Sequence, residues 1–256
     1  MNEPPYPGTQ AVARAMALLK AFDDNHPMWG LTELARETGL NKTTTHRLLA
    51  ALEREGMVGR AADGERYVLG PEIVVLGGRA LRANNLRAVA RPELERLAAK
   101  TGETASLEIL TGTEMLVIDE IVGGHLMSGV PDLGSRWPVH ASSTGLVALA
   151  FMPEDDARAL LPATLLSVTR QTFTNRADLW RELEVTRRRG YSIGDETLEV
   201  GLVAIAAPVF NHDGQVMAAI SIAGPKLRVT PKCVPAIGEQ VRAAANSVSA
   251  RLGYRP

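Results

Sequence analysis

The chain has 256 residues, 45% of them hydrophobic, so it is long enough to bury one large core or two smaller ones. Its 28 basic and 29 acidic residues give a formal net charge of −1, which excludes a protein held to nucleic acid by overall charge alone. A single cysteine, Cys233, excludes an internal disulfide and fits a reducing compartment. Because no apolar run is long enough to span a membrane and the N-terminus is polar, we expect a cytoplasmic protein with no metal site and no cofactor.

The first seventy residues carry signals for three short helices and a β-hairpin. Apolar side chains recur at helical spacing, Gly39 ends the second helix, and Asn41 is a good N-cap for the third. The dipeptide Asp63-Gly64 marks the turn of the hairpin. The expected helices cover 11–22, 31–38 and 42–55, and the expected strands cover 57–60 and 65–69. Two helices joined by a short turn and followed by a hairpin predict a winged helix-turn-helix domain over 9–70.

In such a domain the third helix enters the major groove with its N-terminal end. Steps of 100° per residue put Thr45 and three leucines on the core-facing side of this helix, and polar and basic residues opposite them. These polar groups can reach base edges and phosphates, and the hairpin adds two arginines. The candidate DNA-binding residues are Lys42, Thr43, Thr44, His46, Arg47, Arg60 and Arg66. Since the segment 9–70 holds eight basic and eight acidic residues, the prediction depends on how the charges are arranged.

The rest of the chain alternates helices with strands. The segment 71–100 is helical, rich in arginine and interrupted near Asn84-Asn85, which predicts a helical linker over 71–86. The expected strands cover 104–110, 115–121, 125–130, 191–196, 204–210 and 216–223, and the further helices cover 142–151, 153–161, 176–189 and 234–252. Hairpin connections among mixed elements predict an α+β protein. Its second domain, over 87–252, should be an α/β domain with a largely antiparallel sheet.

Several segments, in order along the chain, resemble the isocitrate-lyase-regulator (IclR) family of bacterial transcriptional regulators. The matching segments are LTELARETGL (31–40), KTTTHRLLAAL (42–52), GMV (56–58), YVLG (67–70), LGSRWPVHAS (133–142), RGYS (189–192) and GLVAIAAPVF (201–210). The resemblance covers roughly 9–252. It implies a winged helix-turn-helix domain and an effector-binding domain with a GAF/PAS-like sheet. It also implies homodimers, often paired into tetramers, on a palindromic operator in double-stranded DNA.

The resemblance places an effector pocket among 141–145, 194–204 and the strand that contains Ser221. Carried over position by position, it nominates as effector-binding residues Gly129, Trp137, Ser143, Thr144, Leu202, Ala204 and Ser221, with Ala223 as a further wall position. Relatives that sense small keto-acids have an aspartate where this chain has Gly194. We expect small and apolar walls with few polar groups, and therefore an effector that is aromatic or less charged than a keto-acid.

Two other functions fit parts of the pattern. A hydrolase could use Ser142 or Ser143 next to His140, but a nucleophile elbow needs Gly-x-Ser-x-Gly and its first glycine is absent, so we expect no enzyme. A protein-interaction module would give the third helix no role on DNA. Individual residues also have structural interpretations, in which Trp137 packs on the sheet, Ser221 bonds to backbone and His140 orders its loop. The prediction is a DNA-binding regulator, a repressor in the simplest case, of a neighbouring catabolic operon.

Overall fold

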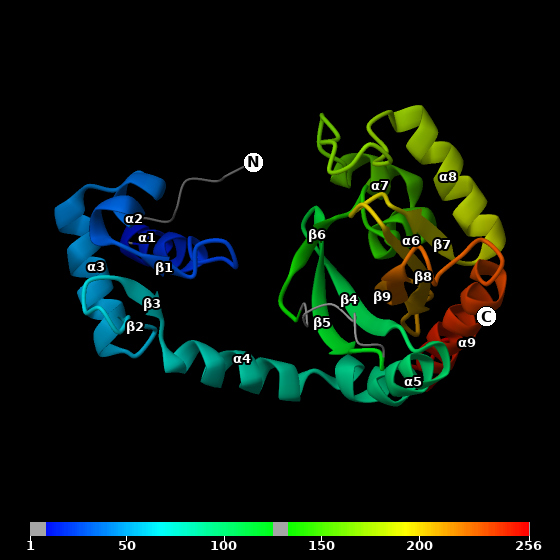
Figure 1. Ribbon diagram of the computed structural model, residues 1–256, viewed down its shortest axis with the longest axis horizontal. Coiled ribbons are helices and arrows are strands. Elements are labelled where there is room, and N and C mark those ends of the chain that lie inside the picture. The colour runs from blue at the N-terminus through cyan, green and yellow to red at the C-terminus, as the bar shows by residue number, and fades with distance from the viewer. Residues whose placement is uncertain (1–8, 125–132, 256) are drawn as a thin grey trace. The chain divides into compact units, whose positions relative to one another are not determined.

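The computed structural model describes residues 9–124 and 133–255, and the chain divides into two compact units, 1–83 and 84–256. Figure 1 shows the first unit in blue to cyan and the second in green to red. The predicted strand 125–130 and the candidate pocket residue Gly129 lie outside the described residues.

The first unit is the predicted winged helix-turn-helix. Its elements are α1 (Gln10–Lys20), β1 (Met28–Trp29), α2 (Leu31–Glu37), α3 (Lys42–Arg54), β2 (Val58–Arg60), β3 (Tyr67–Leu69) and α4 (Pro71–Ala83). The three strands form an antiparallel sheet in the order β1-β3-β2. The two-residue strand β1 was not expected from the sequence, and it is held by pairing of Met28 with Val68 and of Trp29 with Tyr67.

Local capping and a small apolar core explain why these residues adopt this fold. Asn41 caps α3 as predicted, because its side-chain oxygen accepts a hydrogen bond from the backbone N–H of Thr44 at 2.8 Å. Gly39, with a φ of +67°, ends α2 in the left-handed region that favours glycine. One apolar residue from each of α1, α2 and α3, namely Leu18, Leu34 and Leu49, is fully buried in the core of this unit.

The second unit contains a six-stranded sheet in the order β6-β5-β4-β9-β8-β7, and every neighbouring pair is antiparallel. Its elements are α5 (Asn85–Thr101), β4 (Thr104–Thr111), β5 (Glu114–Ile121), β6 (Arg136–Pro138), α6 (Ser143–Phe151), α7 (Glu154–Leu160), α8 (Arg176–Arg189), β7 (Ser192–Asp195), β8 (Leu202–Phe210), β9 (Val216–Pro225) and α9 (Val234–Arg251). The expected antiparallel sheet is confirmed. The short strand β6 was not expected, and it pairs Trp137 with Met115.

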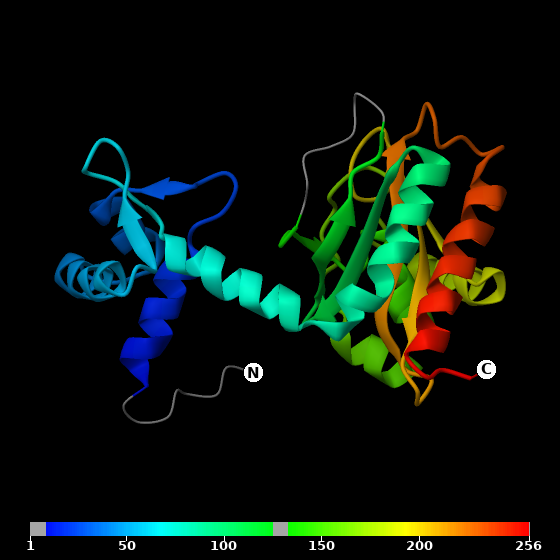
Figure 2. The same cartoon turned by 90° about the horizontal axis from the view of Figure 1, so that it is seen from below.

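Helices cover both faces of this sheet. Figure 2 shows α5 and α9 together on one face, where Leu94 and Val241 pack against alternate strand residues such as Ile205. On the opposite face α6, α7 and α8 share a second core that includes Leu149 and the next strand residue, Ala206. Because side chains alternate along a strand, one apolar run in β8 serves both cores. The same alternation directs polar side chains of β4 to the α6 side.

The expected interruption of the arginine-rich helical segment lies at Asn84. Helix α4 ends at Ala83, and the Asn84 side chain caps α5 by accepting a hydrogen bond from the backbone N–H of Arg87 at 3.2 Å. Within the described parts of the chain, no helix is both long and apolar enough to cross a membrane.

Candidate DNA-binding face and effector cavity

The leading turns of α3 present the predicted polar face. Lys42, Thr43, His46 and Arg47 are exposed and Thr44 is half-buried, whereas Thr45, Leu49 and Leu52 point into the core. Neither Lys42 nor Arg47 makes an ion pair within the described residues, so both charges stay available on the surface. The faces of the helix therefore match the prediction made from 100° steps, and contact with DNA by these side chains stays a prediction.

The two wing arginines are engaged with their own hairpin. The Arg60 guanidinium donates to the Tyr67 hydroxyl at 2.7 Å, lies 3.9 Å from the centre of the Tyr67 ring, and pairs with Glu53 at 3.2 Å. Arg66 pairs with Asp63 at 2.6 Å, and hydrogen bonds from Arg66 hold the pKa of Asp63 at about 2. These contacts support the shape of the wing, so a DNA contact by either arginine would have to share or replace them.

A cavity of about 640 Å³ lies in the second unit, on the α6 side of the sheet. It gathers every described pocket residue that the sequence nominated, namely Trp137, Ser143, Thr144, Leu202, Ala204, Ser221 and Ala223. The hollow exists because Gly194, Ala204, Ala223 and Thr104 follow one another across β7, β8, β9 and β4. Such small side chains cannot fill the space above the sheet. That these residues bind an effector stays a prediction.

A β-bulge positions the polar wall contributed by β5. The register between β4 and β5 shifts between Leu107 and Glu108, which puts Ile118 and Asp119 on the α5 side together. Glu120 therefore points to the opposite side of the sheet and lines the cavity. Val117, which pairs with Glu108 just before the bulge, also lines it. On β4 the polar residues Thr104, Ser106 and Glu108 alternate with buried apolar ones and line the same cavity.

The N-terminus of α6 forms a second wall and is rigidly built. The Ser142 hydroxyl caps the helix by accepting from the Gly145 N–H at 3.1 Å, and the Thr144 hydroxyl donates to the Glu108 carboxylate at 2.5 Å. Gly145 is required here, because a Cβ at this position would overlap the carbonyl oxygen of Val139. Residues 143–150 of α6 are all buried, so the helix is enclosed on every side.

The loop 196–201 covers the cavity and is anchored by hydroxyl side chains. The Thr197 hydroxyl donates to the Ala141 carbonyl at 2.6 Å, and the Thr172 hydroxyl donates to the Thr197 carbonyl at 2.7 Å. Glu196 has a φ of +57° and accepts from Lys226 at 2.5 Å. This hydrogen bond lowers the pKa of Glu196, and bonds to Asp195 and Glu196 raise the pKa of Lys226. The ordered loop leaves the cavity defined without any bound molecule.

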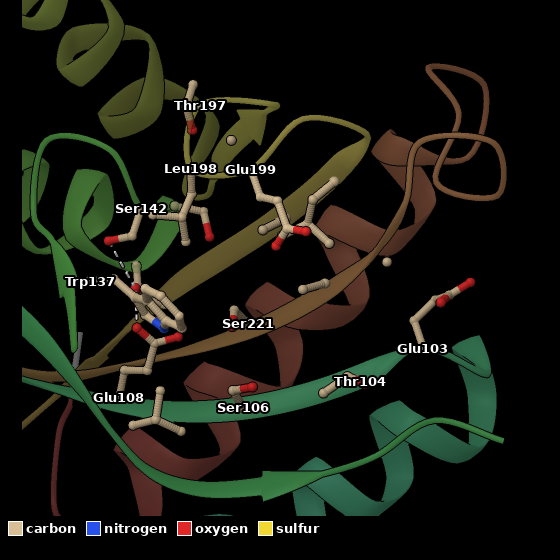
Figure 3. Close-up of a pocket in the computed structure, with 18 of the residues that line it drawn as sticks. Glu103, Thr104, Ser106, Glu108, Trp137, Ser142, Thr197, Leu198, Glu199 and Ser221 are labelled. Atoms are coloured by element: carbon tan, nitrogen blue, oxygen red, sulfur yellow. Dashed lines mark hydrogen bonds between the residues drawn. The ribbon is translucent and has the colours of Figure 1, made fainter. Parts of the chain in front are cut away.

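The cavity wall is more polar than the sequence indicated. It contains Glu103, Glu108, Glu120 and Glu199, as well as hydroxyl groups from β4, β9, the start of α6 and the loop 196–201. Figure 3 labels three of these glutamates, Glu103, Glu108 and Glu199. Arg228 binds both carboxylate oxygens of Glu103, at 2.6 and 2.7 Å, and these bonds raise the pKa of the Arg228 guanidinium. The expectation of few polar groups was therefore wrong. That expectation was based on the glycine and alanine positions of β7 and β8. The carboxylates come from β4 and the residue before it, from β5 and from the loop 196–201.

His140 lies away from this cavity wall. It is buried, and its Nε2 lies 2.9 Å from the carbonyl oxygen of Leu166, which fits the expected role of ordering its loop. Among residues 9–124 and 133–255, no group of three His, Cys, Asp or Glu side chains is arranged to hold a metal ion.

A DNA-reading head joined to a unit with a polar cavity defines the class of ligand-responsive transcription factors. The model of the bacterial transcriptional regulator IclR C-terminal domain matches residues 78–250, and that of the IclR helix-turn-helix domain matches residues 11–62. The chain therefore belongs to the IclR family of transcriptional regulators, whose helix-turn-helix domain binds DNA and whose second domain binds an effector.

Individual relatives agree with this assignment over nearly the whole chain. The transcriptional repressor IclR of Escherichia coli is 34% identical over 247 residues, which cover 95% of this chain and 90% of that protein. A crystal structure of an IclR regulator from Alicyclobacillus acidocaldarius matches with a TM-score of 0.85 and 32% identity, covering 95% of this chain and 98% of that one. An IclR homologue from Microbacterium hydrocarbonoxydans, solved with 4-hydroxybenzoate, matches with a TM-score of 0.79 and 29% identity, covering 95% and 99%. These relatives are regulators rather than enzymes, which sets the hydrolase alternative aside.

Proposed function

We propose that this chain is a repressor that binds a palindromic operator as a homodimer, with dimers able to pair into tetramers, and that an aromatic effector controls this binding. The observation that carries the proposal is the exposed polar face on the first turns of α3. Its basic residues, Lys42 and Arg47, are not bound to acids within the described residues. A neighbouring catabolic operon is the proposed target, and the relative from Escherichia coli is itself named a transcriptional repressor.

Exposed apolar side chains on the first unit support dimer formation. Val74 of α4 is 76% exposed, Leu76 is exposed on the same helix, and Val12 and Met16 are exposed on α1. Of these, Val12 and Met16 are four residues apart and share one face of α1, and an exposed apolar face of this kind is a candidate interaction surface. A two-fold dimer would supply two copies of α3, as the two half-sites of a palindrome require.

An aromatic effector is supported by the Trp137 indole on the cavity wall and by the cavity volume of about 640 Å³. A flat ring beside an indole gains stacking energy in addition to the burial of apolar surface. The homologue from Microbacterium hydrocarbonoxydans was solved with 4-hydroxybenzoate, a compound of this class.

Strand β5 offers a route by which the effector could influence the linker. Glu120 lines the cavity, and its neighbour Asp119 accepts hydrogen bonds from Arg87 and Arg91 of α5 at 3.1 and 2.8 Å. Helix α5 follows α4 in the chain after the single residue Asn84. The other carboxylate oxygen of Asp119 and the Arg87 Nε are buried and have no partner among the described residues, so a small shift could form a further bond between them. We therefore infer that effector binding acts on α5 through Asp119.

Operator binding is tested by a gel shift of the full chain with the DNA upstream of its own gene, over a range of salt concentrations. Arg47→Ala should weaken binding by about 1–3 kcal/mol, or roughly 10- to 100-fold, because a bidentate contact to a base edge contributes that much. Arg181→Ala, which removes one exposed positive charge from α8, is the control and should leave binding unchanged.

Two results would contradict operator binding through α3. One is the absence of a shift at every salt concentration below the physiological value. The other is equal loss of affinity in Arg47→Ala and Arg181→Ala, which would mean that only net charge matters.

A further inference from the structure

The cavity holds a carboxylate of the protein itself at the N-terminus of a helix. Glu108 of β4 is 6% exposed, and its Oε2 accepts a hydrogen bond from the hydroxyl of Thr144, the second residue of α6, at 2.5 Å. The N-terminus of a helix favours an anion, because its backbone N–H groups and its dipole point toward that end. In this chain the Glu108 carboxylate therefore lies where an anionic ligand would otherwise find its most favourable position.

The cations of the described cavity wall already bind acids of the protein. Arg228 is held by both oxygens of Glu103, and Arg136 lies 3.7 Å from Glu114 and donates to the Thr111 hydroxyl at 2.7 Å. A ligand carboxylate near Glu108 would thus meet like charge, and would have to take an arginine from an existing ion pair.

Two serines that line the same cavity have hydroxyl groups without a hydrogen-bond partner among the described residues. Ser221 of β9 is 3% exposed and Ser143 of α6 is 5% exposed, and neither hydroxyl makes a hydrogen bond with the described chain. Figure 3 shows Ser221, Ser106 and Glu108 directed from the strands into one hollow. Both serines line the cavity, so their hydroxyl groups are available to a polar group of a bound molecule.

We propose that the effector presents a hydrogen-bond donor to Glu108, and that it is an aromatic amine or alcohol rather than an aromatic carboxylate. The inference rests on the proposed function, since it specifies the effector of that same cavity. In this arrangement the ring lies against Trp137, an ammonium or hydroxyl group donates to Glu108, and the Ser221 hydroxyl bonds to a second polar group of the ligand. The contact with Glu108 is charge-assisted, which makes it the strongest discriminator between ligands of equal size.

Isothermal titration calorimetry with three probes that share one ring tests this preference directly. The probes are 4-hydroxybenzylamine, 4-hydroxybenzyl alcohol and 4-hydroxybenzoate, which carry a positive, a neutral and a negative group at the same position. With the full-length protein we expect the amine to bind at least about ten-fold more tightly than the benzoate, with the alcohol between them. Tighter binding of the benzoate than of the amine would overturn the inference.

The variant Glu108→Gln removes the charge and keeps the shape of the side chain. It should reduce the preference for amine over benzoate by about ten-fold or more, whereas Glu184→Gln on the exposed surface of α8 should leave the preference unchanged. Thermal unfolding checks that the variant is folded. If it is not, the order of affinities of the three probes for the wild-type protein decides.

An unchanged preference in the folded glutamine variant would exclude Glu108 as the discriminating group. If none of the three probes binds, the aromatic effector and this inference are both wrong, whereas operator binding, measured on DNA alone, is unaffected. If the benzoate alone binds, the proposal of an aromatic effector is supported, whereas the proposed hydrogen bond from the effector to Glu108 is refuted.

Discussion

Replacement of Asp119 tests the proposed connection between β5, which lines the cavity, and helix α5. One oxygen of this buried carboxylate accepts from Arg87 at 3.1 Å, from Arg91 at 2.8 Å and from the backbone N–H of Glu120 at 3.1 Å. Asp119→Ala removes all three acceptor contacts at once. Asp119→Asn keeps one acceptor oxygen in the same place, removes the charge and replaces the second oxygen by an NH2 group.

The size of the effect follows from the burial of each partner. Breaking a fully buried ion pair costs about 3–5 kcal/mol, because it leaves a charge without a partner in the interior. The arginine side chains are 26% and 43% exposed, so water screens part of that loss and the expected cost of Asp119→Ala is about 3 kcal/mol. For a unit of this size that corresponds to a fall in Tm of roughly 6–12 °C. Asp119→Asn should cost about 1 kcal/mol.

Urea unfolding of the full chain measures the stability, and a gel shift with and without 4-hydroxybenzylamine measures the response to ligand. Asp119→Asn should bind operator DNA with nearly normal affinity and lose most of the change in affinity that the ligand causes. Asp178→Ala breaks an exposed ion pair on α8 and serves as control, with an expected cost below about 0.5 kcal/mol. The reasoning would be refuted if Asp119→Ala unfolded at the same urea concentration as this control, or if Asp119→Asn kept the full ligand response.

Three further substitutions, two at helix glycines and one at a carboxylate, test packing and electrostatics. Gly238→Ala should destabilise the protein by about 1–3 kcal/mol in urea unfolding, because the new Cβ overlaps the Tyr191 ring, whereas Gly77→Ala in open space on α4 should stabilise its helix by up to about 1 kcal/mol. Burial raises the pKa of Glu93, but hydrogen bonds from Ser247 and Arg96 outweigh it and hold the pKa below its ordinary value of 4.5. A carboxylate whose pKa is lowered by folding stabilises the protein above its ordinary pKa, and this contribution is lost as the pH falls through the pKa of the folded state. Because Glu93→Gln has no such contribution to lose, its free energy of unfolding in urea should fall less than that of wild type between about pH 5 and pH 3. Equal stability of the two glycine variants, or parallel pH profiles for Glu93→Gln and wild type, would contradict these expectations.

Elements with their own local signals were predictable from the sequence. Helix α3 carries its N-cap Asn41, α8 ends at Gly190 with a φ of +81°, and β4 and β5 flank a short turn. Strands β1 and β6 were missed because they are two and three residues long and no turn signal marks them, unlike the equally short β2 and β3, which flank Asp63-Gly64. Such segments are too short to show periodicity, and only their partner strands hold them extended.

The polar wall of the cavity was only partly predictable. The family resemblance supplied Trp137, Ser143 and Ser221, whereas Glu108 and Glu120 were overlooked. A signal for Glu108 was present, because the polar residues Thr104, Ser106 and Glu108 alternate with apolar ones and must share one face of a strand. No such signal existed for Glu120, since its side of the sheet is decided by the β-bulge, and a bulge depends on pairing between strands.

The enclosure of α6 on every side has a consequence for how this receptor can be altered. Residues 143–150 are buried, and the strands beneath them pack against two separate cores, so the backbone of α6 has little freedom to adapt. Single substitutions at positions 108, 120 and 221 should therefore change which molecule is recognised without changing the fold. This arrangement makes the second unit a suitable starting point for biosensors, in which libraries confined to those side chains could be screened against a fixed frame.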